Sequence, residues 1–486
     1  MTGIGWVDTG IVIFNYFILF FAASVMLSYL ILAIISAVSL KSYLRKNRFV
    51  NYNALLSLTD APKVSLIAPA YNEGMTIQEN VNSLLAINYN NFDVIVVNDG
   101  SKDDSISILI DAFDLIVSDK QYNEIIPTKE VKTIYTSKNP SYSKLIVVDK
   151  ENGGKADALN TGINISENPY VVCIDVDCIM DKDVLLKLMK PFLEQSDKRV
   201  IATGGVIRIA NSCVIKSGKL IKVNAPDNFL ARIQVLEYLR AFILGRMAWA
   251  KMDGLLLISG AFGMFDREIV VKAGGYNTKT VGEDMELVVR MRRYMIDNKF
   301  KYAVQYIPDP LCWTEAPESF KILRKQRSRW TRGTFETLWI HRGMLFNPKY
   351  KILGLFSFPY WLLYEYWAPL IEFTGLLITL LFIYFGILSW SYFLIFFLFV
   401  YSFAIMFSML ALYSEEATYR KYSTLKDLRK LAFISLLEPL IFHPFTVYAA
   451  IRGNWEKLRG SRGWGDMTRT GFKKETVISE EKQKND

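Results

Sequence analysis

The feature that most constrains the fold is a long run without a charged side chain, Gly10 to Val38. It exceeds the roughly 20 residues that a helix needs to cross a bilayer. It has no basic segment before it and no small-residue cleavage site after it, so we expect a membrane span and not a removable signal peptide. The basic segment Lys41–Arg48 comes directly after the run, and the positive-inside rule therefore predicts that the chain enters the cytoplasm there.

The composition between about residue 60 and residue 341 is that of a soluble α/β domain. Apolar, β-rich runs at 63–71, 92–100 and 143–154 each end in polar residues, and helical patterns such as 105–117 lie between them. This alternation predicts a mostly parallel, twisted sheet. Ligands of such sheets bind at the carboxyl ends of the strands, which is where these polar residues stand.

The chain becomes membrane-like again from residue 351. Segments 368–390 and 393–413 are long and apolar enough to span a bilayer, whereas segment 431–451 is long enough but contains a glutamate, a histidine and two prolines. A cytoplasmic tail requires an even number of spans after the first one. Either segment 431–451 does not cross fully, or segment 352–367 contributes a further crossing.

The overall composition, 51% hydrophobic and 22% charged, is that of a membrane protein with a sizeable soluble part. The net charge of +9 fits Lys and Arg on the cytoplasmic side, and no zinc-finger or basic-repeat pattern accompanies it, so we expect no nucleic-acid partner. The cysteines are scattered without a CxxC pair, and we expect reduced thiols in the core and neither disulfides nor zinc ligands. They are Cys173, Cys178, Cys213 and Cys312.

The stretch "VVCIDVDCIM", residues 171–180, is a predicted buried strand that ends in two carboxylates. Asp175 and Asp177 stand two residues apart, which places them on the same face of an extended strand. Two like charges at that distance raise each other's proton affinity unless a positive partner lies between them. Hard oxygen ligands suit Mg²⁺ or Mn²⁺, so we expect a divalent cation at this position.

Other strand ends carry the groups that a nucleotide needs. Tyr71 offers an aromatic face and Glu73 an acceptor after the first strand, and Asp99 stands at the end of the second. Lys155 follows two glycines after the third, where small residues let the backbone approach a phosphate and the ammonium supplies the counter-charge. Together with the aspartate pair, these residues predict a site for a nucleoside diphosphate and a metal.

Two further motifs complete the pattern, "TVGEDMEL" at 280–287 and "KQRSRWTRG" at 325–333. The order Asp-X-Asp, Glu-Asp, Gln-X-X-Arg-Trp resembles the processive, membrane-embedded family-two glycosyltransferases, which include cellulose, hyaluronan, mixed-linkage glucan and poly-N-acetylglucosamine synthases. The resemblance covers about residues 64–330 and the flanking helices. It implies a GT-A fold, a UDP-sugar donor, a divalent metal, inversion at the anomeric carbon and export of the polymer through the membrane part.

The resemblance also implies a role for each motif residue. Asp284 would be the general base that accepts the proton of the attacking acceptor hydroxyl, although a carboxylate at a helix N-terminus also stabilises the helix dipole. Asp177 and Asp175 would hold the metal. The implied donor-binding residues are Tyr71, Glu73, Asp99, Lys155, Asp175 and Arg329. The implied acceptor-binding residues are Ser259 and Gly260 of "ISGAFGMF" together with Gln326 and Trp330.

Some segments depart from the family patterns. The phosphate loop reads "GGKADALN", and the base motif is Gly-Glu-Asp instead of Thr-Glu-Asp. The tail segment "RGSRGWGDMTRTGF", residues 459–472, resembles the gating segment of hyaluronan synthases, with Asp466 in place of a threonine. We expect it to fold over the nucleotide site from the cytoplasmic side, with Trp464 and Arg469 as gating residues and Arg469 at the donor phosphates. A basic anchor beside the membrane is the alternative.

The sequence therefore predicts an N-terminal span with a basic flank, a GT-A domain, amphipathic interface helices, a C-terminal membrane region and a basic tail. These parts cover residues 1–48, 60–317, 318–350, 351–452 and 453–486. The predicted activity is processive transfer from a UDP-sugar to a growing β-linked polysaccharide, with a β-glucan favoured, by a multi-pass plasma-membrane protein whose catalytic domain is cytoplasmic. Synthesis of hyaluronan or poly-N-acetylglucosamine, transfer of one sugar to a membrane lipid, and nucleotide binding without catalysis in a transporter or receptor are the alternatives.

Overall fold

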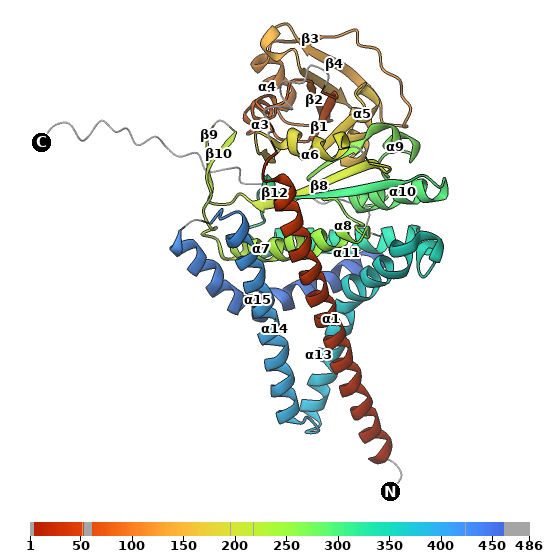
Figure 1. Ribbon diagram of the computed structural model, residues 1–486, viewed down its shortest axis with the longest axis vertical. Coiled ribbons are helices and arrows are strands. Elements are labelled where there is room, and N and C mark those ends of the chain that lie inside the picture. The colour runs from red at the N-terminus through yellow and green to blue at the C-terminus, as the bar shows by residue number, and fades with distance from the viewer. Residues whose placement is uncertain are drawn as a thin grey trace, which may run out of the picture.

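The computed structural model describes residues 4–50, 52, 61–194, 196–216, 218–422 and 424–460. Figure 1 shows a sheet-containing domain above a group of long helices. The first of these, α1 (Ile4–Asn47), leads from the far end of the group up to the domain. It carries Arg45 and Lys46 in its last turn, at the end beside the domain.

A sheet forms the core of the upper domain, and within the described residues it has ten strands in the order β3–β4–β5–β2–β1–β6–β11–β8–β12–β7. Its strands are β1 (Val64–Ala70), β2 (Phe92–Asp99), β3 (Leu115–Val117), β4 (Val131–Ser137), β5 (Leu145–Lys150), β6 (Tyr170–Ile174), β7 (Ile179–Met180), β8 (Arg199–Ile209), β11 (Phe262–Asp266) and β12 (Tyr302–Thr314). A separate hairpin pairs β9 (Val214–Lys216) with β10 (Lys219–Lys222). The predicted α/β architecture is confirmed.

The strand directions in this sheet are mixed. Strands β5, β2, β1 and β6 run parallel to one another, and β12 runs parallel to β8. Strand β11 lies antiparallel between β6 and β8, and the pairs β3–β4, β4–β5 and β12–β7 are also antiparallel. The prediction of a mostly parallel sheet was therefore right for the β5–β6 half and wrong for most of the rest, where β8 and β12 form the one parallel pair among the described strands. Strand β11 comes from a distant part of the chain and inserts antiparallel beside β6.

The helices of the upper domain follow the predicted alternation with one exception. They are α3 (Ile77–Leu85), α4 (Ser105–Ala112), α5 (Lys155–Ile165), α6 (Val184–Leu193), α9 (Arg267–Lys272) and α10 (Glu283–Asp297). The helix predicted over 105–117 ends early, at Ala112. Asp114 ends it by adopting a left-handed backbone with φ of 50°. The β-branched Ile116 and Val117 then pair with β4 at the edge of the sheet.

A layer of helices lies between the sheet and the long helices (Figure 1). It contains α7 (Phe229–Leu239), the π-helical η2 (Arg240–Arg246), α8 (Met247–Lys251) and α11 (Phe320–Ile340). The 3₁₀ turns η3 (Arg342–Met344) and η4 (Pro348–Tyr350) follow α11. A further turn, η1 (Pro140–Tyr142), lies in the upper domain.

A buried ion pair joins Arg208 of the sheet to Glu415 of a long helix. An ion pair as well as apolar packing therefore joins the long helices to the sheet domain.

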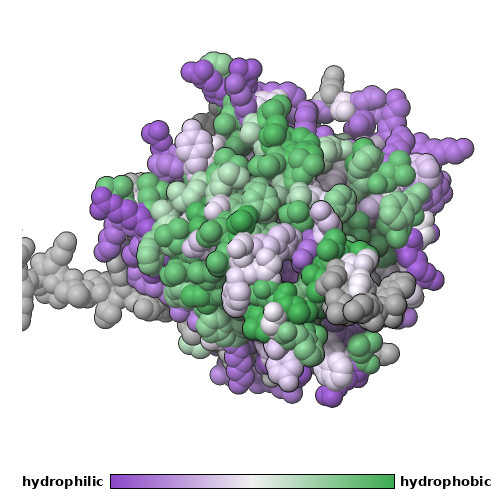
Figure 2. All heavy atoms as spheres, turned by 90° about the horizontal axis from the view of Figure 1, so that it is seen from below, coloured by the Kyte–Doolittle hydropathy of each residue, from purple (hydrophilic) through white to green (hydrophobic). Residues whose placement is uncertain are grey.

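Among the described residues, four helices are long and apolar enough to cross a membrane by length and composition: Thr9–Asn47, Leu353–Tyr384, Trp390–Thr418 and Leu425–Leu458. The second consists of η5 (Leu353–Ser357), α12 (Phe358–Tyr360), η6 (Trp361–Trp367) and α13 (Ala368–Tyr384) in direct succession. Segment 352–367 therefore continues directly into α13, and we do not count it as a separate crossing. Seen from below, the molecule is mostly hydrophobic with a hydrophilic rim (Figure 2).

Helix α15 (Leu425–Leu458) takes a different course from α1, α13 and α14 (Trp390–Thr418). In Figure 1 it passes beneath the sheet-containing domain and across the upper parts of those helices. Its second half lies beside α11, where the rings of Phe445 and Phe320 are 4.8 Å apart and Ser328 donates a 2.9 Å hydrogen bond to the carbonyl of Ala449. These contacts favour the alternative in which this segment does not cross the bilayer.

Candidate active site

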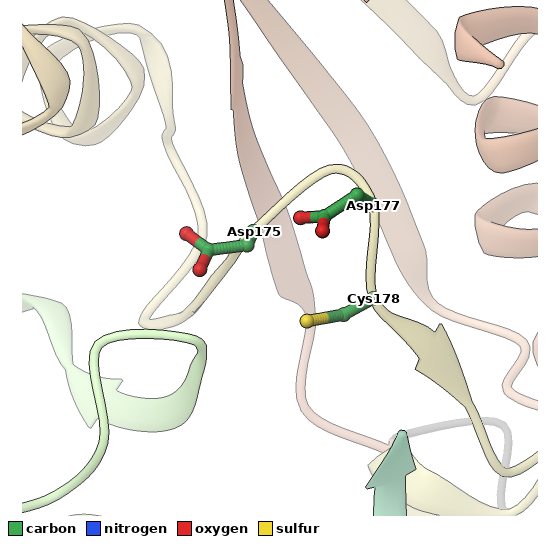
Figure 3. Close-up of side chains that lie close together, drawn as sticks. All are labelled: Asp175, Asp177 and Cys178. Carbon is green, nitrogen blue, oxygen red and sulfur yellow. The ribbon is translucent and has the colours of Figure 1, made fainter. Parts of the chain in front are cut away.

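Three side chains with metal-ligating atoms lie on the loop between β6 and β7. The ligand atoms of Asp175, Asp177 and Cys178 all lie within 4.8 Å of one another, and Figure 3 shows the three side chains leaving one short loop. Strand β6 ends at Ile174. The two carboxylates therefore come together through a turn, closed by a 3.0 Å hydrogen bond from the N–H of Cys178 to the carbonyl of Asp175, and not on one face of a continuing strand as predicted.

Lys155 supplies a positive partner for this loop. It is the first residue of α5, and its ammonium forms an ion pair with Asp175 and donates a 2.9 Å hydrogen bond to the carbonyl of Gly260. Burial alone would lower the pKa of the Lys155 ammonium, but the surrounding carboxylates, Asp175 first among them, raise it overall. The lysine is therefore charged and connects the aspartate loop to Gly260.

Asp284 is connected to the same glycine. It lies in the first turn of α10, where its Oδ2 accepts a 2.8 Å hydrogen bond from the N–H of Gly260 and its Oδ1 accepts one of 2.8 Å from the N–H of Met285. A Cβ at residue 260 would lie only 3.0 Å from Asp284 Oδ2, so any other residue there would push the carboxylate away. The carboxylate is half-buried. Asp175, Lys155, Gly260 and Asp284 thus form one connected cluster.

The sequence analysis missed Glu283, the residue before Asp284. Its side chain is buried in the first turn of α10. Burial, and then the charge of Asp284, raise the pKa of Glu283 to about 7, against the opposing effect of Lys155 and Arg329. A second carboxyl group that titrates near neutral pH therefore stands beside the predicted base, as is common at functional sites. The signal in the sequence was its place in the Glu-Asp motif.

Asp99, at the end of β2, lies under the loop that leads to Lys155. Its buried carboxylate accepts hydrogen bonds of 2.9 Å from Lys150, 2.9 Å from the N–H of Gly153 and 2.8 Å from the N–H of Gly154. These bonds hold the glycine pair in place at the start of α5. A direct contact between Asp99 and a nucleotide stays a prediction.

Three further predicted site residues follow strand β1 or precede Gly260: Tyr71, Glu73 and Ser259. Tyr71 and Glu73 follow β1, which pairs in parallel with the strand that ends at Asp99. The Tyr71 side chain is 43% exposed, which leaves its ring accessible to the base of a nucleotide. Glu73 is half-buried. Ser259 is half-buried and directly precedes Gly260. Their contacts with donor and acceptor stay predictions.

The Gln-X-X-Arg-Trp residues lie on α11, close to the start of α10. Trp330 is 42% exposed, and the guanidinium carbon of Arg327 lies 3.9 Å from the centroid of one of its rings. Arg329 lowers the pKa of Glu283, so its charge acts on the carboxylate pair. Gln326 is half-buried. The structure thus brings the motif to the side of the cluster that carries the predicted base.

Helix α11 and the loop before α10 touch backbone to backbone. A Cβ on Gly282 would lie 2.6 Å from the Cα of Gly333, and a Cβ on Gly333 would lie 2.7 Å from the Cα of Gly282. Gly282 precedes the Glu-Asp pair, and Gly333 follows the Gln-X-X-Arg-Trp motif. This contact fixes the predicted acceptor helix against the residue that leads into Asp284.

The predicted gating residues Trp464 and Arg469 lie outside the described residues, the last of which is Gly460. Helix α15 ends shortly before it, and there Lys457 pairs with Glu336 of α11 at 2.5 Å. The end of α15 therefore lies beside α11. The gating role of the tail stays a prediction.

Comparison with known proteins identifies relatives of the same region. A family model described as "Glycosyltransferase like family 2" matches residues 62–333. The poly-beta-1,6-N-acetyl-D-glucosamine synthase of Staphylococcus aureus (strain COL) is 27% identical over 283 residues, which cover 58% of this chain and 57% of the relative. The synthase of the same name from Staphylococcus epidermidis is 28% identical over 278 residues, 57% of this chain and 55% of the relative. The match spans little more than half the length of these relatives.

Solved structures resemble the chain more distantly. The mannosyltransferase PcManGT from Pyrobaculum calidifontis, in complex with GDP-Man and Mn2+, gives a TM-score of 0.49 at 18% identity and covers 90% of this chain and 99% of its own. Glucosyl-3-phosphoglycerate synthase from Mycobacterium tuberculosis, with Mn2+, UDP and glucosyl-3-phosphoglycerate, gives 0.35 at 16% identity over 61% of this chain and 85% of its own. Neither likeness is close enough to carry residue roles to this chain.

Proposed function

Because this chain belongs to glycosyltransferase family 2, we propose that it transfers sugar from a UDP-sugar to the end of a growing polysaccharide at the cytoplasmic face of the membrane. The observation that carries the proposal is the connected cluster of Asp175, Lys155, Gly260 and Asp284. It places groups suited to a diphosphate next to a group suited to accept a proton. Such an arrangement serves a reaction that releases a diphosphate while a hydroxyl group loses its proton.

The aspartate loop fits a hard divalent cation, Mg²⁺ or Mn²⁺. Asp175 and Asp177 bring carboxylate oxygens to within 4.8 Å of each other, and such cations prefer oxygen ligands. Cys178 offers a sulfur atom, and soft sulfur ligands suit softer metals better than Mg²⁺ or Mn²⁺. We therefore assign the two aspartates to the cation. When bound, the cation would neutralise charge on the diphosphate leaving group.

Lys155 holds the donor in this proposal. Its ammonium lies beside Asp175, so a phosphate oxygen that approaches the aspartate loop comes within its reach. A fixed positive charge at this place anchors the diphosphate and stabilises the negative charge that develops on the departing UDP. The buried carboxylate of Asp99 keeps the loop before Lys155 in position.

Asp284 accepts the proton. The acceptor hydroxyl oxygen forms a bond to the anomeric carbon of the donor, the bond between that carbon and the UDP oxygen breaks, and the hydroxyl proton passes to Asp284. Attack opposite the leaving group inverts the configuration at this carbon. The hydrogen bonds from Gly260 and Met285 use one lone pair on each carboxylate oxygen and leave others for the proton.

Trp330 serves as the platform for the acceptor sugar. Its ring is partly exposed while the guanidinium of Arg327 holds it on one side, so a flat apolar face is available at a fixed place. The contact of Gly333 with Gly282 sets the distance between this platform and the base. A fixed distance of this kind suits repeated addition to the end of one chain.

We propose UDP-N-acetylglucosamine as the donor, because the matched relatives are poly-beta-1,6-N-acetyl-D-glucosamine synthases. The β-glucan that the sequence analysis favoured becomes the alternative, together with hyaluronan. A polymer needs an exit through the bilayer, and the helices long and apolar enough to cross it support a polymer product over a single lipid-linked sugar.

The catalytic domain faces the cytoplasm in this proposal. The basic end of α1 lies beside the domain, as the positive-inside rule requires of a cytoplasmic side. Helix α13 then crosses outward and α14 crosses back, while α15 lies beside α11 on the inner side. In the described part of the chain this gives two crossings after α1, the even number that a cytoplasmic tail requires.

The test is a transfer assay with purified protein in lipid nanodiscs and radiolabelled UDP-N-acetylglucosamine, UDP-glucose or UDP-glucuronate. We expect a high-mass labelled product from UDP-N-acetylglucosamine. A lipid-sized labelled product would replace the polymerase by a lipid glycosyltransferase. The absence of any product from these donors, in a preparation that still binds UDP, would reject the proposed activity.

A further inference from the structure

We propose that Glu336 on α11 is a positioning residue for the general base Asp284, and that it acts by holding the loop 280–282. The inference rests on the proposed function, in which Asp284 accepts the proton. Glu336 acts through the loop that leads into α10, so it shapes the geometry of the reaction without taking part in the chemistry. The evidence for it is a set of hydrogen bonds, an ion pair and a close backbone contact.

One carboxylate oxygen of Glu336 binds the loop. Its Oε2 accepts a 2.8 Å hydrogen bond from the hydroxyl of Thr280 and one of 3.0 Å from the N–H of Val281. The Thr280 hydroxyl in turn accepts a 3.1 Å hydrogen bond from the N–H of Gly282. The residues directly before the Glu-Asp pair are thereby tied to α11.

The other carboxylate oxygen of Glu336 binds the end of α15. Its Oε1 pairs with the ammonium of Lys457 at 2.5 Å, and the Glu336 side chain is only 15% exposed. Burial alone would raise the pKa of Glu336, but its hydrogen bonds to Lys457 and to the loop lower it overall. The carboxylate is therefore ionised at neutral pH and binds both sets of partners at once.

The contact between Gly282 and Gly333 makes the base sensitive to this tether. The two backbones leave no room for a Cβ, and Glu336 stands about one helical turn beyond Gly333 on α11. The same helix carries Trp330, the proposed acceptor platform. A loosened loop would shift Asp284 relative to the acceptor hydroxyl, and a misplacement of about 1 Å at the reacting atoms can lower the rate about 100-fold.

The test compares substitutions at both ends of the tether. Glu336→Ala should lower kcat by about 10- to 100-fold and leave the KM for the UDP-sugar and the affinity for UDP unchanged. Glu336→Gln should recover most of this loss, since an amide oxygen still accepts hydrogen bonds from Thr280 and Val281. Thr280→Val should lower kcat less than Glu336→Ala, and the double variant should be no slower than Glu336→Ala alone, because both changes remove one coupled contact.

A matched control distinguishes positioning from general stabilisation of α10. Asp297, at the other end of that helix, pairs with Lys349 at 2.6 Å and accepts a hydrogen bond from Tyr350 at 3.2 Å. Asp297→Ala also removes a carboxylate and its partners, and it should leave kcat unchanged. Amide hydrogen exchange supplies a readout that does not depend on turnover. The N–H of Val281 should exchange faster in Glu336→Ala than in wild type and at the wild-type rate in Asp297→Ala.

Three results would overturn the inference. The first is a wild-type kcat, or a wild-type exchange rate of the Val281 N–H, in Glu336→Ala while Asp284→Asn is inactive. The assignment of Asp284 as the base would then stand, but the role of Glu336 would be wrong. The second is an equal loss of kcat in Asp297→Ala, which would make the effect one of overall stability. The third is substantial transfer by Asp284→Asn, in which case the proposed base is wrong and the inference fails with it.

Discussion

The main-chain N–H of Gly260 donates a 2.8 Å hydrogen bond to the carboxylate of Asp284, 24 residues further along the chain. The carbonyl of the same glycine accepts a 2.9 Å hydrogen bond from Lys155. One residue therefore joins the side chain proposed to hold the diphosphate to the side chain proposed to accept the proton. It sets the distance between the two ends of the reaction.

Replacing Gly260 by alanine tests this link. The new Cβ would lie 3.0 Å from Asp284 Oδ2 and 3.2 Å from its Cβ, so the base must move. We expect kcat to fall by about 10-fold or more, since small misplacements of a catalytic group are costly. Gly343→Ala is the control, because no described atom lies within 4 Å of a Cβ at that position. A Gly260→Ala enzyme as fast as wild type would show that the base does not depend on this contact.

Removal of the metal should stop transfer. We expect EDTA to abolish turnover and added Mg²⁺ or Mn²⁺ to restore it, because the aspartate loop gathers two carboxylates next to the site of the diphosphate. Asp177→Asn should lower kcat by about 100-fold. Cys178→Ala should retain most of the activity, because soft sulfur is a poor ligand for these hard cations. Full turnover in excess chelator, or a greater loss in Cys178→Ala than in Asp177→Asn, would contradict the assignment.

The rate should depend on pH through Glu283. Ionisation of this group, whose pKa burial raises to about 7, adds a negative charge beside the carboxylate that receives the acceptor proton in the proposed reaction. We therefore expect kcat to rise through an inflection near pH 7 and the Glu283→Gln variant to lack that inflection. Superimposable pH–rate profiles of the two proteins would contradict this expectation.

The same group should affect stability with a definite sign. A carboxyl pKa raised from 4.5 to about 7 means that the folded protein favours the protonated form, so its contribution to stability is present below pH 4.5 and is lost as the pH rises through 7. Glu283→Gln removes that loss. Its thermal unfolding midpoint relative to wild type should therefore be higher at pH 8 than at pH 5, and a difference that does not depend on pH would count against a buried, titrating Glu283.

The course of the helices predicts which ends are accessible from outside the cell. Cysteine introduced at Tyr384, at the far end of α13, should react with an impermeant thiol reagent on intact cells, because its side chain is 81% exposed there. Cysteine introduced at Arg459, directly after α15, should react only after the membrane is opened. Labelling of the Arg459 position from outside would contradict the cytoplasmic position of the tail and the gating role of Trp464 and Arg469.

Much of the site was predictable because the carboxyl ends of parallel strands meet at one edge of a sheet. Asp99 ends β2, and Lys155 and Asp175 follow β5 and β6. These three strands lie in the parallel half of the sheet. The links between these groups were not predictable. The hydrogen bonds that join Gly260 to Lys155 and to Asp284 depend on β11, which begins shortly after Gly260 and inserts beside β6 from a distant part of the chain.

Hydropathy could not predict the course of α15. Its apolar content is that of a span, but its direction depends on side chains of other segments. Arg240 of η2 pairs with Glu438 at 2.9 Å, and Ser328 of α11 binds the Ala449 carbonyl. Glu283 and Glu336 were missed for a related reason, since their roles depend on burial and on partners that only the folded chain brings near.

The most direct test of the account is the turnover of Asp284→Asn, measured together with its affinity for UDP. The asparagine oxygen can still accept the hydrogen bond from Gly260, but the amide cannot take up a proton at neutral pH. The account predicts a fall in kcat of about 10²- to 10⁴-fold with an unchanged Kd for UDP. A variant that keeps more than about a tenth of wild-type turnover, or one that loses UDP affinity in proportion to its turnover, would contradict the central claim that Asp284 is the base.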